Sequence, residues 1–152
     1  IRLPFNSLEK NATPPAEEKI LQGKNQKVLI VDDESTVRIP LVEILKSMGY
    51  LAASAESGKE ALEKYASWLP DLVLMDRNMP DMDGVTCAEK IAENDLNARI
   101  ILISGYDKDG INGVDLKSRQ FIKGYLTKPI SIKNLNHALN ELFHDPATTT
   151  SN

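Results

Sequence analysis

The sequence predicts an α/β protein: a doubly wound, five-stranded parallel sheet with helices on both faces. The first observation is a set of continuous apolar runs at Val28–Val31, Leu72–Met75 and Ile100–Ile103. Runs without polar alternation are typical of strands that are buried on both faces. The second observation is that segments with helical periodicity separate these runs. Strands that alternate with helices indicate parallel crossover connections.

The first strand–helix pair is clearly marked. Lys27–Val31 is predicted to be a strand. Ser35 is expected to be the N-cap of a helix that runs to about Met48, where Gly49 ends it. Pro40 lies inside this helix and should bend or loosen its first turns, because proline removes one backbone hydrogen bond.

The middle of the chain continues the alternation. Residues 50–54 form a weaker strand. The sequence Ser57-Gly-Lys-Glu60 matches a capping box, which starts a helix that runs to about Trp68. The central strand, residues 71–75, follows, and a helix is expected from about Gly84 to Asn94.

The last third provides two more strands. Residues 98–104 contain the third strongly apolar run, and residues 121–126 form the last strand. Residues 107–120 are expected to form one short or irregular helix, because two glycines lower helix propensity there by about 1 kcal/mol each relative to alanine. Ser131 is expected to cap a final amphipathic helix.

The ends of the chain differ from its middle. Residues 1–26 are predicted to be an N-terminal tail or linker, residues 27–144 one domain, and residues 145–152 a disordered C-terminal tail. A single domain of this length can bury a real hydrophobic core.

Composition limits the function classes. The net charge of −4 does not favour binding to nucleic acid, and no apolar run approaches the roughly 20 residues of a membrane span. No secretory signal is visible. Cys87 is the only cysteine, so no internal disulfide can form, and we interpret it as a small buried residue rather than a reactive thiol. A reducing, cytoplasmic setting is expected.

Chemically active side chains follow four of the five predicted strands. They are Asp32 and Asp33 after the first strand, Asp76 after the third, Ser104 at the end of the fourth and Lys128 after the fifth. The carboxyl ends of parallel strands meet at one edge of the sheet, where open α/β sheets bind ligands. In the flavodoxin-like strand order 2-1-3-4-5 these four strands are neighbours, about 4.8 Å apart.

Carboxylates at that spacing repel one another. At about 5 Å and an effective dielectric constant near 20, each pair costs about 3 kcal/mol. Protonation, Lys128 or a divalent cation can relieve the repulsion, and hard oxygen ligands with room for water suit Mg²⁺. A cation, a lysine and a hydroxyl around one carboxylate also suit phosphoryl transfer, with Asp76 as the nucleophile.

Each of these residues also has an ordinary explanation when it is taken singly. Asp32-Asp33 is a common turn or helix-capping pair, Asp76 an ordinary turn acid, Ser104 a strand-end hydroxyl and Lys128 a loop residue. The combination indicates function, because four separate strand ends converge on one chemistry.

Four motifs in this order resemble the receiver domains of two-component response regulators. They are residues 28–34, VLIVDDE; 71–84, DLVLMDRNMPDMDG; 101–105, ILISG; and 125–129, YLTKP. The resemblance covers about residues 27–143.

The resemblance implies an acceptor and a metal site. Asp76 would be the phosphoacceptor, which takes a phosphoryl group from the phosphohistidine of a histidine kinase. In a hybrid kinase the receiver would relay this group to a histidine phosphotransfer protein. Asp33 would bind Mg²⁺ directly, Asp32 would assist through water, and Asp76 and the backbone carbonyl of Asn78 would complete the protein ligands. The domain would catalyse its own phosphorylation and dephosphorylation.

The resemblance also implies a switch. Ser104 would be the switch hydroxyl, Lys128 would pair with the phosphoryl group, and Tyr125 would rotate on activation. The Lys128–Pro129 peptide bond is expected to be cis, as in the family. Asn78 and Tyr106 occupy positions that tune the lifetime of the phosphoryl group, and a bulky Tyr106 could hinder the attacking water.

One departure concerns the segment before the last strand. The family usually has a Gly-Ala turn there, whereas this chain has Arg119-Gln-Phe-Ile-Lys123. The fourth helix, the switch surface around Tyr125 and the choice of partner are therefore not carried over from the family.

The N-terminal residues suggest a setting. Ile1-Arg-Leu-Pro-Phe5 resembles the end of a histidine kinase ATP-binding domain. Kinase end, linker and receiver together form the layout of a hybrid sensor kinase, which could be the cytoplasmic part of a membrane-bound protein. A stand-alone or truncated response regulator is the alternative.

The remaining expectations concern partners and competing functions. We expect a monomer or weak dimer that contacts neither nucleic acid nor membrane through this domain. An Asp-nucleophile phosphatase would share the same residues, and a binding module without phosphorylation would keep the fold. A flavodoxin-like cofactor carrier is disfavoured, because no phosphate-binding glycine loop follows the first strand.

Overall fold

A computed structural model of the chain describes residues 23–105 and 120–143. The expected tails, the irregular segment at 107–119 and Tyr106 lie outside the described residues, apart from residues 23–26. Those residues join the fold, since the Gly23 and Asn25 amides donate to the carbonyls of Met48 and Gly49.

The sheet has the predicted topology. Its five parallel strands lie in the order β2-β1-β3-β4-β5. Their bounds are, in chain order, β1 Lys27–Val31, β2 Leu51–Ala55, β3 Leu72–Asp76, β4 Ile100–Ser104 and β5 Ile122–Thr127. The central register pairs Val31 with Met75, and Asp76 with Ile103.

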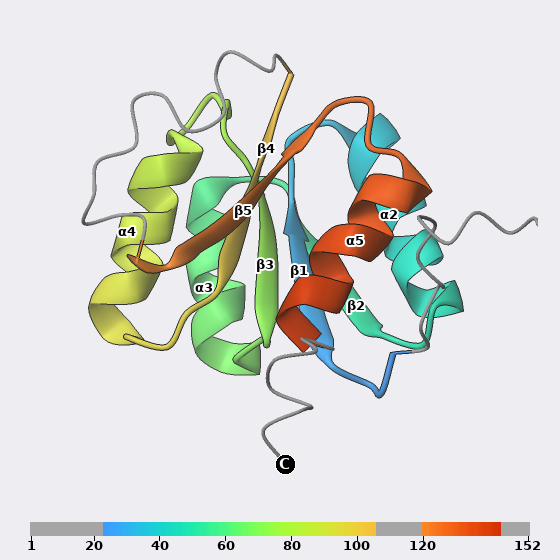
Figure 1. Ribbon diagram of the computed structural model, residues 1–152. Helices are drawn as coiled ribbons and strands as arrows, with labels where there is room; N and C mark the ends of the chain where they lie inside the picture. The colour runs from blue at the N-terminus through green and yellow to red at the C-terminus, as the bar shows by residue number, and fades with distance from the viewer. Residues whose placement is uncertain (1–22, 106–119, 144–152) are drawn as a thin grey trace, which may run out of the picture. The chain divides into compact units, whose positions relative to one another are not determined.

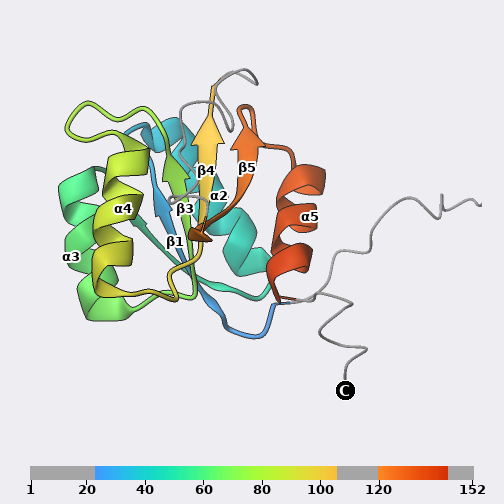
Figure 2. The same ribbon diagram turned by 60° about the vertical axis from the view of Figure 1, so that its left-hand side comes forward.

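Helices cover both faces of the sheet. Helix α2, Ser35–Ser47, lies on one face, and helices α3, Gly58–Trp68, and α4, Gly84–Asn94, lie side by side on the other (Figures 1 and 2). These elements belong to one compact unit, residues 22–131. Helix α5, Ile132–Phe143, belongs to a second unit and is a single twelve-residue helix.

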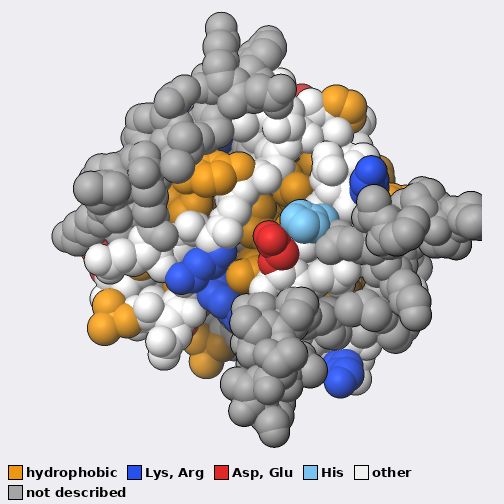
Figure 3. All heavy atoms as spheres, in the orientation of Figure 1, with side chains coloured by type: hydrophobic (Ala, Val, Ile, Leu, Met, Phe, Trp, Pro, Cys, Tyr) orange, Lys and Arg blue, Asp and Glu red, His pale blue; other side chains and the backbone are white. Residues whose placement is uncertain are grey.

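Consecutive strand residues are buried on opposite faces of the sheet. Leu29, Val73 and Leu102 belong to the apolar cluster beneath α3 and α4, and the intervening Ile30 and Leu74 are equally buried. The continuous apolar runs thus reflect burial on both faces of the sheet. In the space-filling view, described hydrophobic side chains reach the surface only in separate patches (Figure 3).

The helix ends explain where the elements begin. Helix α3 has the predicted cap, since Ser57 Oγ accepts the Glu60 amide at 3.1 Å, while Glu60 Oε1 accepts the Glu56 amide at 2.8 Å. Asp83 caps α4 by accepting the Val85 and Thr86 amides.

The expected cap of α2 is wrong by one residue. Ser35 is already the first helical residue and Glu34 is the N-cap, but the Glu34 side chain accepts no hydrogen bond from the first amides of the helix. The Glu34 carboxylate instead contacts Lys128 of the site described below, at 3.1 Å. Pro40 lies inside α2 without ending it, and Gly49 follows the helix with φ 96°. No helix among the described residues is long and apolar enough to cross a membrane.

Candidate metal and phosphoacceptor site

The fold brings the predicted site residues to one edge of the sheet. Asp32 and Asp33 follow β1, Asp76 ends β3, and Lys128 follows β5. Ser104 ends β4, where its carbonyl oxygen accepts the Lys128 amide at 2.8 Å. Parallel pairing in the order 2-1-3-4-5 is what makes these ends neighbours.

Three carboxylates form the centre of this edge. Ligand oxygens of Asp32, Asp33 and Asp76 all lie within 4.8 Å of one another. Asp32 is fully buried and Asp76 is 2% exposed, whereas Asp33 is exposed. The cluster therefore has two buried acids and one that faces solvent. Such an arrangement can hold a cation that keeps some of its water on the exposed side.

Lys128 compensates part of this charge. Its Nζ lies 3.1 Å from Asp32 Oδ2, 3.1 Å from Glu34 Oε1 and 3.6 Å from Asp76 Oδ1. Burial alone would lower the pKa of Lys128, but the surrounding carboxylates outweigh it and raise this pKa. The lysine is therefore charged, and one ammonium group serves three acids.

One ammonium group does not neutralise the buried acids completely. Burial, followed by repulsion from Asp32, raises the pKa of Asp76 from 3.8 to about 7, although the Asn78 amide and Lys128 act in the opposite direction. Asp32 Oδ2 is buried without a hydrogen-bond donor, and its contact with Lys128 is an ion pair alone. Both observations fit a site that a further cation would stabilise.

Backbone groups fix the buried carboxylates. Asp32 Oδ1 accepts the Glu34 amide at 2.8 Å, and Asp76 Oδ1 accepts the Asn78 amide at 3.2 Å. Arg38 Nη1 donates to the carbonyl oxygen of Asp32 at 2.9 Å. The acids are therefore held in place before any ligand binds.

Gly84 allows the chain after Asp76 to turn closely. A Cβ atom at this position would lie 2.3 Å from the carbonyl oxygen of Asp76 and 2.8 Å from Cα of Arg77. The Gly84 amide donates to the carbonyl oxygen of Arg77 at 2.8 Å. Any side chain here would push the start of α4 away from the end of β3.

The residues expected to form a switch have distinct surroundings. Ser104 is buried, with 4% exposed. Tyr125 packs against the apolar cluster under α3 and α4, and its buried hydroxyl has no hydrogen-bond partner among the described residues. The Lys128–Pro129 peptide bond is cis. Their roles in switching stay predictions.

Sequence reasoning missed two neighbours of the site. Glu34 pairs with Lys128 across 94 positions, and Arg38 binds the backbone of Asp32. The run Asp32-Asp33-Glu34 carries a third acid, and Arg38 follows Glu34 by one helical turn, which is the spacing at which side chains share a helix face. That spacing was the only available signal for Arg38.

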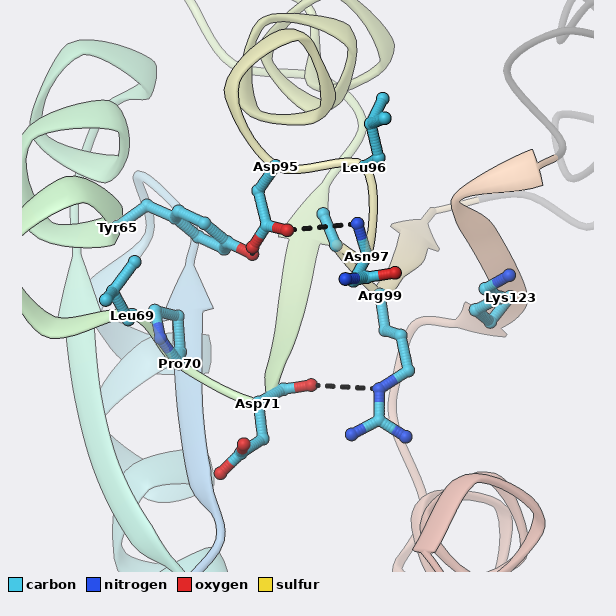
Figure 4. Close-up of a pocket in the computed structure, with 10 residues that line it drawn as sticks. Tyr65, Leu69, Pro70, Asp71, Asp95, Leu96, Asn97, Arg99 and Lys123 are labelled. Carbon is cyan, nitrogen blue, oxygen red and sulfur yellow. Dashed lines mark hydrogen bonds between the residues drawn. The ribbon is translucent and has the colours of Figure 1, made fainter.

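A different hollow lies at the opposite, amino-terminal edge of the sheet (Figure 4). It measures about 650 Å³ and holds two acids, each already hydrogen-bonded. Asp95 accepts the Tyr65 hydroxyl at 2.7 Å, and Asp71 accepts the Lys27 amide at 2.8 Å. Burial, then the Asp95 bond, raises the pKa of Tyr65. These groups stabilise the fold and do not form an acidic cluster.

The fold and the site together define a class of protein. It is an α/β protein in which a buried aspartate, paired with a lysine and flanked by two further acids, ends the central strand of a flavodoxin-like sheet. Such a site offers a carboxylate of the kind that can act as a nucleophile, beside oxygen ligands of the kind that hold a divalent cation.

Comparison with known proteins identifies the family. The family model of the response regulator receiver domain matches residues 28–140, and the chain belongs to this family. The chain is 36% identical over 118 residues to the chemotaxis protein CheY of Bacillus subtilis, covering 76% of this chain and 95% of the relative. The receiver domain and the flavodoxin-like fold predicted from the sequence are thereby confirmed.

Solved structures show the same fold. The response regulator protein TrrA from Thermotoga maritima, in complex with Mg²⁺ and beryllium fluoride, aligns with a TM-score of 0.69 at 34% identity and covers 78% of this chain and 99% of that one. A chain of the CheX–CheY complex with beryllium fluoride and Mg²⁺ from Borrelia burgdorferi aligns with a TM-score of 0.67 at 33% identity, and the match covers 78% of this chain and 89% of that one.

Membership sets the general function. The chain carries a receiver domain of two-component signalling, a class of domain that binds Mg²⁺ at an acidic pocket and interacts with histidine kinases or phosphotransfer proteins. This chain has an acidic cluster of Asp32, Asp33 and Asp76 at the carboxyl-terminal edge of its sheet.

Proposed function

We propose that this receiver accepts a phosphoryl group on Asp76 from a phosphohistidine, in a reaction that depends on Mg²⁺. The observation that carries the proposal is the geometry around Asp76. Its carboxylate lies within 4.8 Å of two other acids and 3.6 Å from the Lys128 ammonium, at the end of a strand buried on both faces.

In the proposed reaction, an oxygen of Asp76 attacks the phosphorus atom of the phosphohistidine. A P–O bond forms, the P–N bond breaks, and the imidazole nitrogen of the donor takes up a proton. Lys128 is placed to pair with the negative phosphoryl oxygens, as it pairs with Asp76 in this structure. The Ser104 hydroxyl is proposed to hydrogen-bond to the same group and, with Tyr125, to couple phosphorylation to a conformational change.

The acidic residues fit a magnesium ion. We propose that Asp33 and Asp76 bind it directly, Asp32 through water, and Asn78 through its backbone carbonyl. Exposed Asp33 leaves one side open to water, as a hydrated magnesium site requires. The ion, when bound, would neutralise charge on the phosphoryl oxygens.

A partner that carries the histidine must reach this edge, and the surface beside Lys128 is suited to it. A groove of about 410 Å³ lies between α2 and the segment after β5, with a predominantly apolar lining. Val37, Leu41 and Ile44 line it on α2, and Pro129 and Ile130 line it on the other side. We propose that a histidine kinase or a histidine phosphotransfer protein packs an apolar helix face here, which places its histidine near Asp76.

The test is phosphorylation by acetyl phosphate, followed by intact mass spectrometry. We expect wild type to gain one phosphoryl group with Mg²⁺ and none with EDTA. Asp76→Asn should gain none, while Glu63→Gln, which removes an exposed carboxylate on α3, should behave as wild type. No mass gain in wild type despite Mg²⁺ binding, and again none with a phosphorylated histidine donor, would leave a binding module. Repeated turnover of phosphate esters would instead favour a phosphatase.

The wider setting is a separate proposal. We propose that the receiver is the C-terminal part of a hybrid histidine kinase, on the basis of Ile1–Phe5, which lie outside the described residues. A stand-alone or truncated response regulator is the alternative. Locating the coding sequence in its genome decides between them, because a hybrid kinase requires a kinase domain in the same reading frame.

A further inference from the structure

The loop that follows Asp76 is attached to the start of a neighbouring helix. Residues 77–83 connect β3 to α4. Within this loop, Asp81 Oδ1 accepts the Gly58 amide at 3.1 Å, and Asp81 Oδ2 accepts the Lys59 amide at 3.2 Å. One carboxylate therefore bridges the loop to the first turn of α3, 22 to 23 positions earlier in the chain.

These two bonds use amides that a helix cannot satisfy by itself. The first amides of an α-helix have no carbonyl partner within the helix. In α3, Ser57 accepts the Glu60 amide, and Asp81 accepts the two amides that precede it. A negative charge at this end is also favoured by the helix dipole. The bridge is therefore a favourable contact and not an incidental proximity.

Two further contacts hold the same junction. A Cβ atom at Gly58 would lie 2.9 Å from Met82 Cβ and 3.1 Å from Met82 Sδ, so the loop rests directly on the helix backbone. From the first turn of α4, Cys87 Sγ donates to the carbonyl oxygen of Gly58 at 3.7 Å. The loop is thus placed by α3 as well as by its own ends.

The ends of the loop are tied to the site. The Asn78 amide donates to Asp76 Oδ1, and the Gly84 amide donates to the carbonyl oxygen of Arg77. Between these two ties, Asp81 supplies the side-chain bridge to a different helix. Displacement of the loop at Asp81 would therefore be transmitted to Asn78, three residues away.

We propose that Asp81 is a positioning residue for the magnesium site, which holds the loop that carries Asn78 against α3. The inference rests on the proposed function, because it assigns Asp81 an effect on a metal that Asp33, Asp76 and the Asn78 carbonyl would bind. Asp81 would act through the loop, because its two carboxylate oxygens accept the amides of Gly58 and Lys59.

The first test is the Mg²⁺ dissociation constant of the full chain, measured by isothermal titration calorimetry. Asp81→Ala should weaken Mg²⁺ binding by about tenfold, the lower end for groups that orient metal ligands. Gly58→Ala should weaken it in the same direction, because the new Cβ displaces Met82 while the charge of Asp81 remains. Comparison of the two variants therefore separates the effect of the loop position from the effect of the Asp81 charge.

Ser57→Ala is the matched control. It removes a cap from the same turn of α3 and should lower the melting temperature in EDTA, as Asp81→Ala does, but Ser57 does not bridge to the loop. Its Mg²⁺ affinity should stay within about twofold of wild type. A purely structural role for Asp81 predicts instead that affinity follows melting temperature in all three variants.

The second test needs no metal. In EDTA, backbone hydrogen exchange in residues 77–84 should be faster in Asp81→Ala and Gly58→Ala than in wild type, and unchanged in Ser57→Ala. Wild-type affinity in Asp81→Ala, or equal weakening in Ser57→Ala, would overturn the inference alone. Failure of wild type itself to bind Mg²⁺ would overturn the proposed metal site and with it this inference. Calorimetry of wild type alone detects that failure, so the two outcomes are distinguishable.

Discussion

Replacement of Asp76 by asparagine should stabilise the magnesium-free protein at about pH 8, although it removes the proposed phosphoacceptor. Asp76 is 2% exposed and shares its site with Asp32 and Asp33. Burial and repulsion from Asp32 raise its pKa from 3.8 to about 7. The ionised aspartate therefore costs the folded state free energy, and an isosteric neutral side chain does not.

The magnitude follows from the shift. About 3 pKa units correspond to about 4 kcal/mol, as an upper limit, once Asp76 is ionised in both states. Loss of the attraction to Lys128 and relaxation of the site reduce this value, so we expect a gain of at least about 1 kcal/mol in Asp76→Asn. Because the folded-state pKa is the higher one, the contribution of Asp76 to wild-type stability should fall as pH rises from about 3.8 to about 7, then level off.

Urea denaturation in EDTA, followed by circular dichroism between about pH 5 and pH 8, measures this difference. The gap between Asp76→Asn and wild type should widen with pH, and Glu63→Gln should run parallel to wild type. Added Mg²⁺ should stabilise wild type more than the variant, because a ligand of the folded state raises its stability. A gap that is constant with pH, or a variant less stable than wild type at about pH 8, would refute the argument.

Three further predictions concern packing and titration. Gly84→Ala should destabilise the protein by about 2 kcal/mol or more, because its Cβ would lie 2.3 Å from the carbonyl oxygen of Asp76; a loss below about 0.5 kcal/mol in urea denaturation would contradict this. Tyr65→Phe should cost about 1 kcal/mol through loss of its 2.7 Å bond to Asp95, and an unchanged urea midpoint would argue against that bond. Burial raises the pKa of the Cys87 thiol from 9.0 to about 11. At about pH 8, Cys87 should therefore react with a disulfide reagent at least about 100-fold more slowly in the folded than in the unfolded protein. Similar rates in both states would show that the thiol is accessible.

Much of the candidate site could be predicted because it depends on strand ends. The apolar runs identify β1, β3 and β4, and the residue that follows a run in a parallel sheet lies at the ligand edge. Asp32, Asp76 and Lys128 were found in this way, and the structure brings them together. The bounds of α4, Gly84–Asn94, were also predicted correctly, and the structure adds Asp83 as the cap at its start.

The contacts between distant segments could not be predicted in this way. Glu34 contacts Lys128, and this contact accompanies the one-residue error in the predicted cap of α2. Asp81 resembles an ordinary turn residue in the sequence, yet it accepts two amides of α3. The different exposure of neighbouring Asp32 and Asp33 is likewise invisible in a pair of identical letters.

The sequence by itself determined the alternation of strands and helices and the chemical groups at the strand ends, because hydrophobic periodicity and capping act over a few residues. Only the tertiary structure decided which acid is buried, which acids share Lys128 and which loop rests on α3. Those outcomes depend on distances between residues far apart in the chain, which are set when the crossovers place one strand beside another.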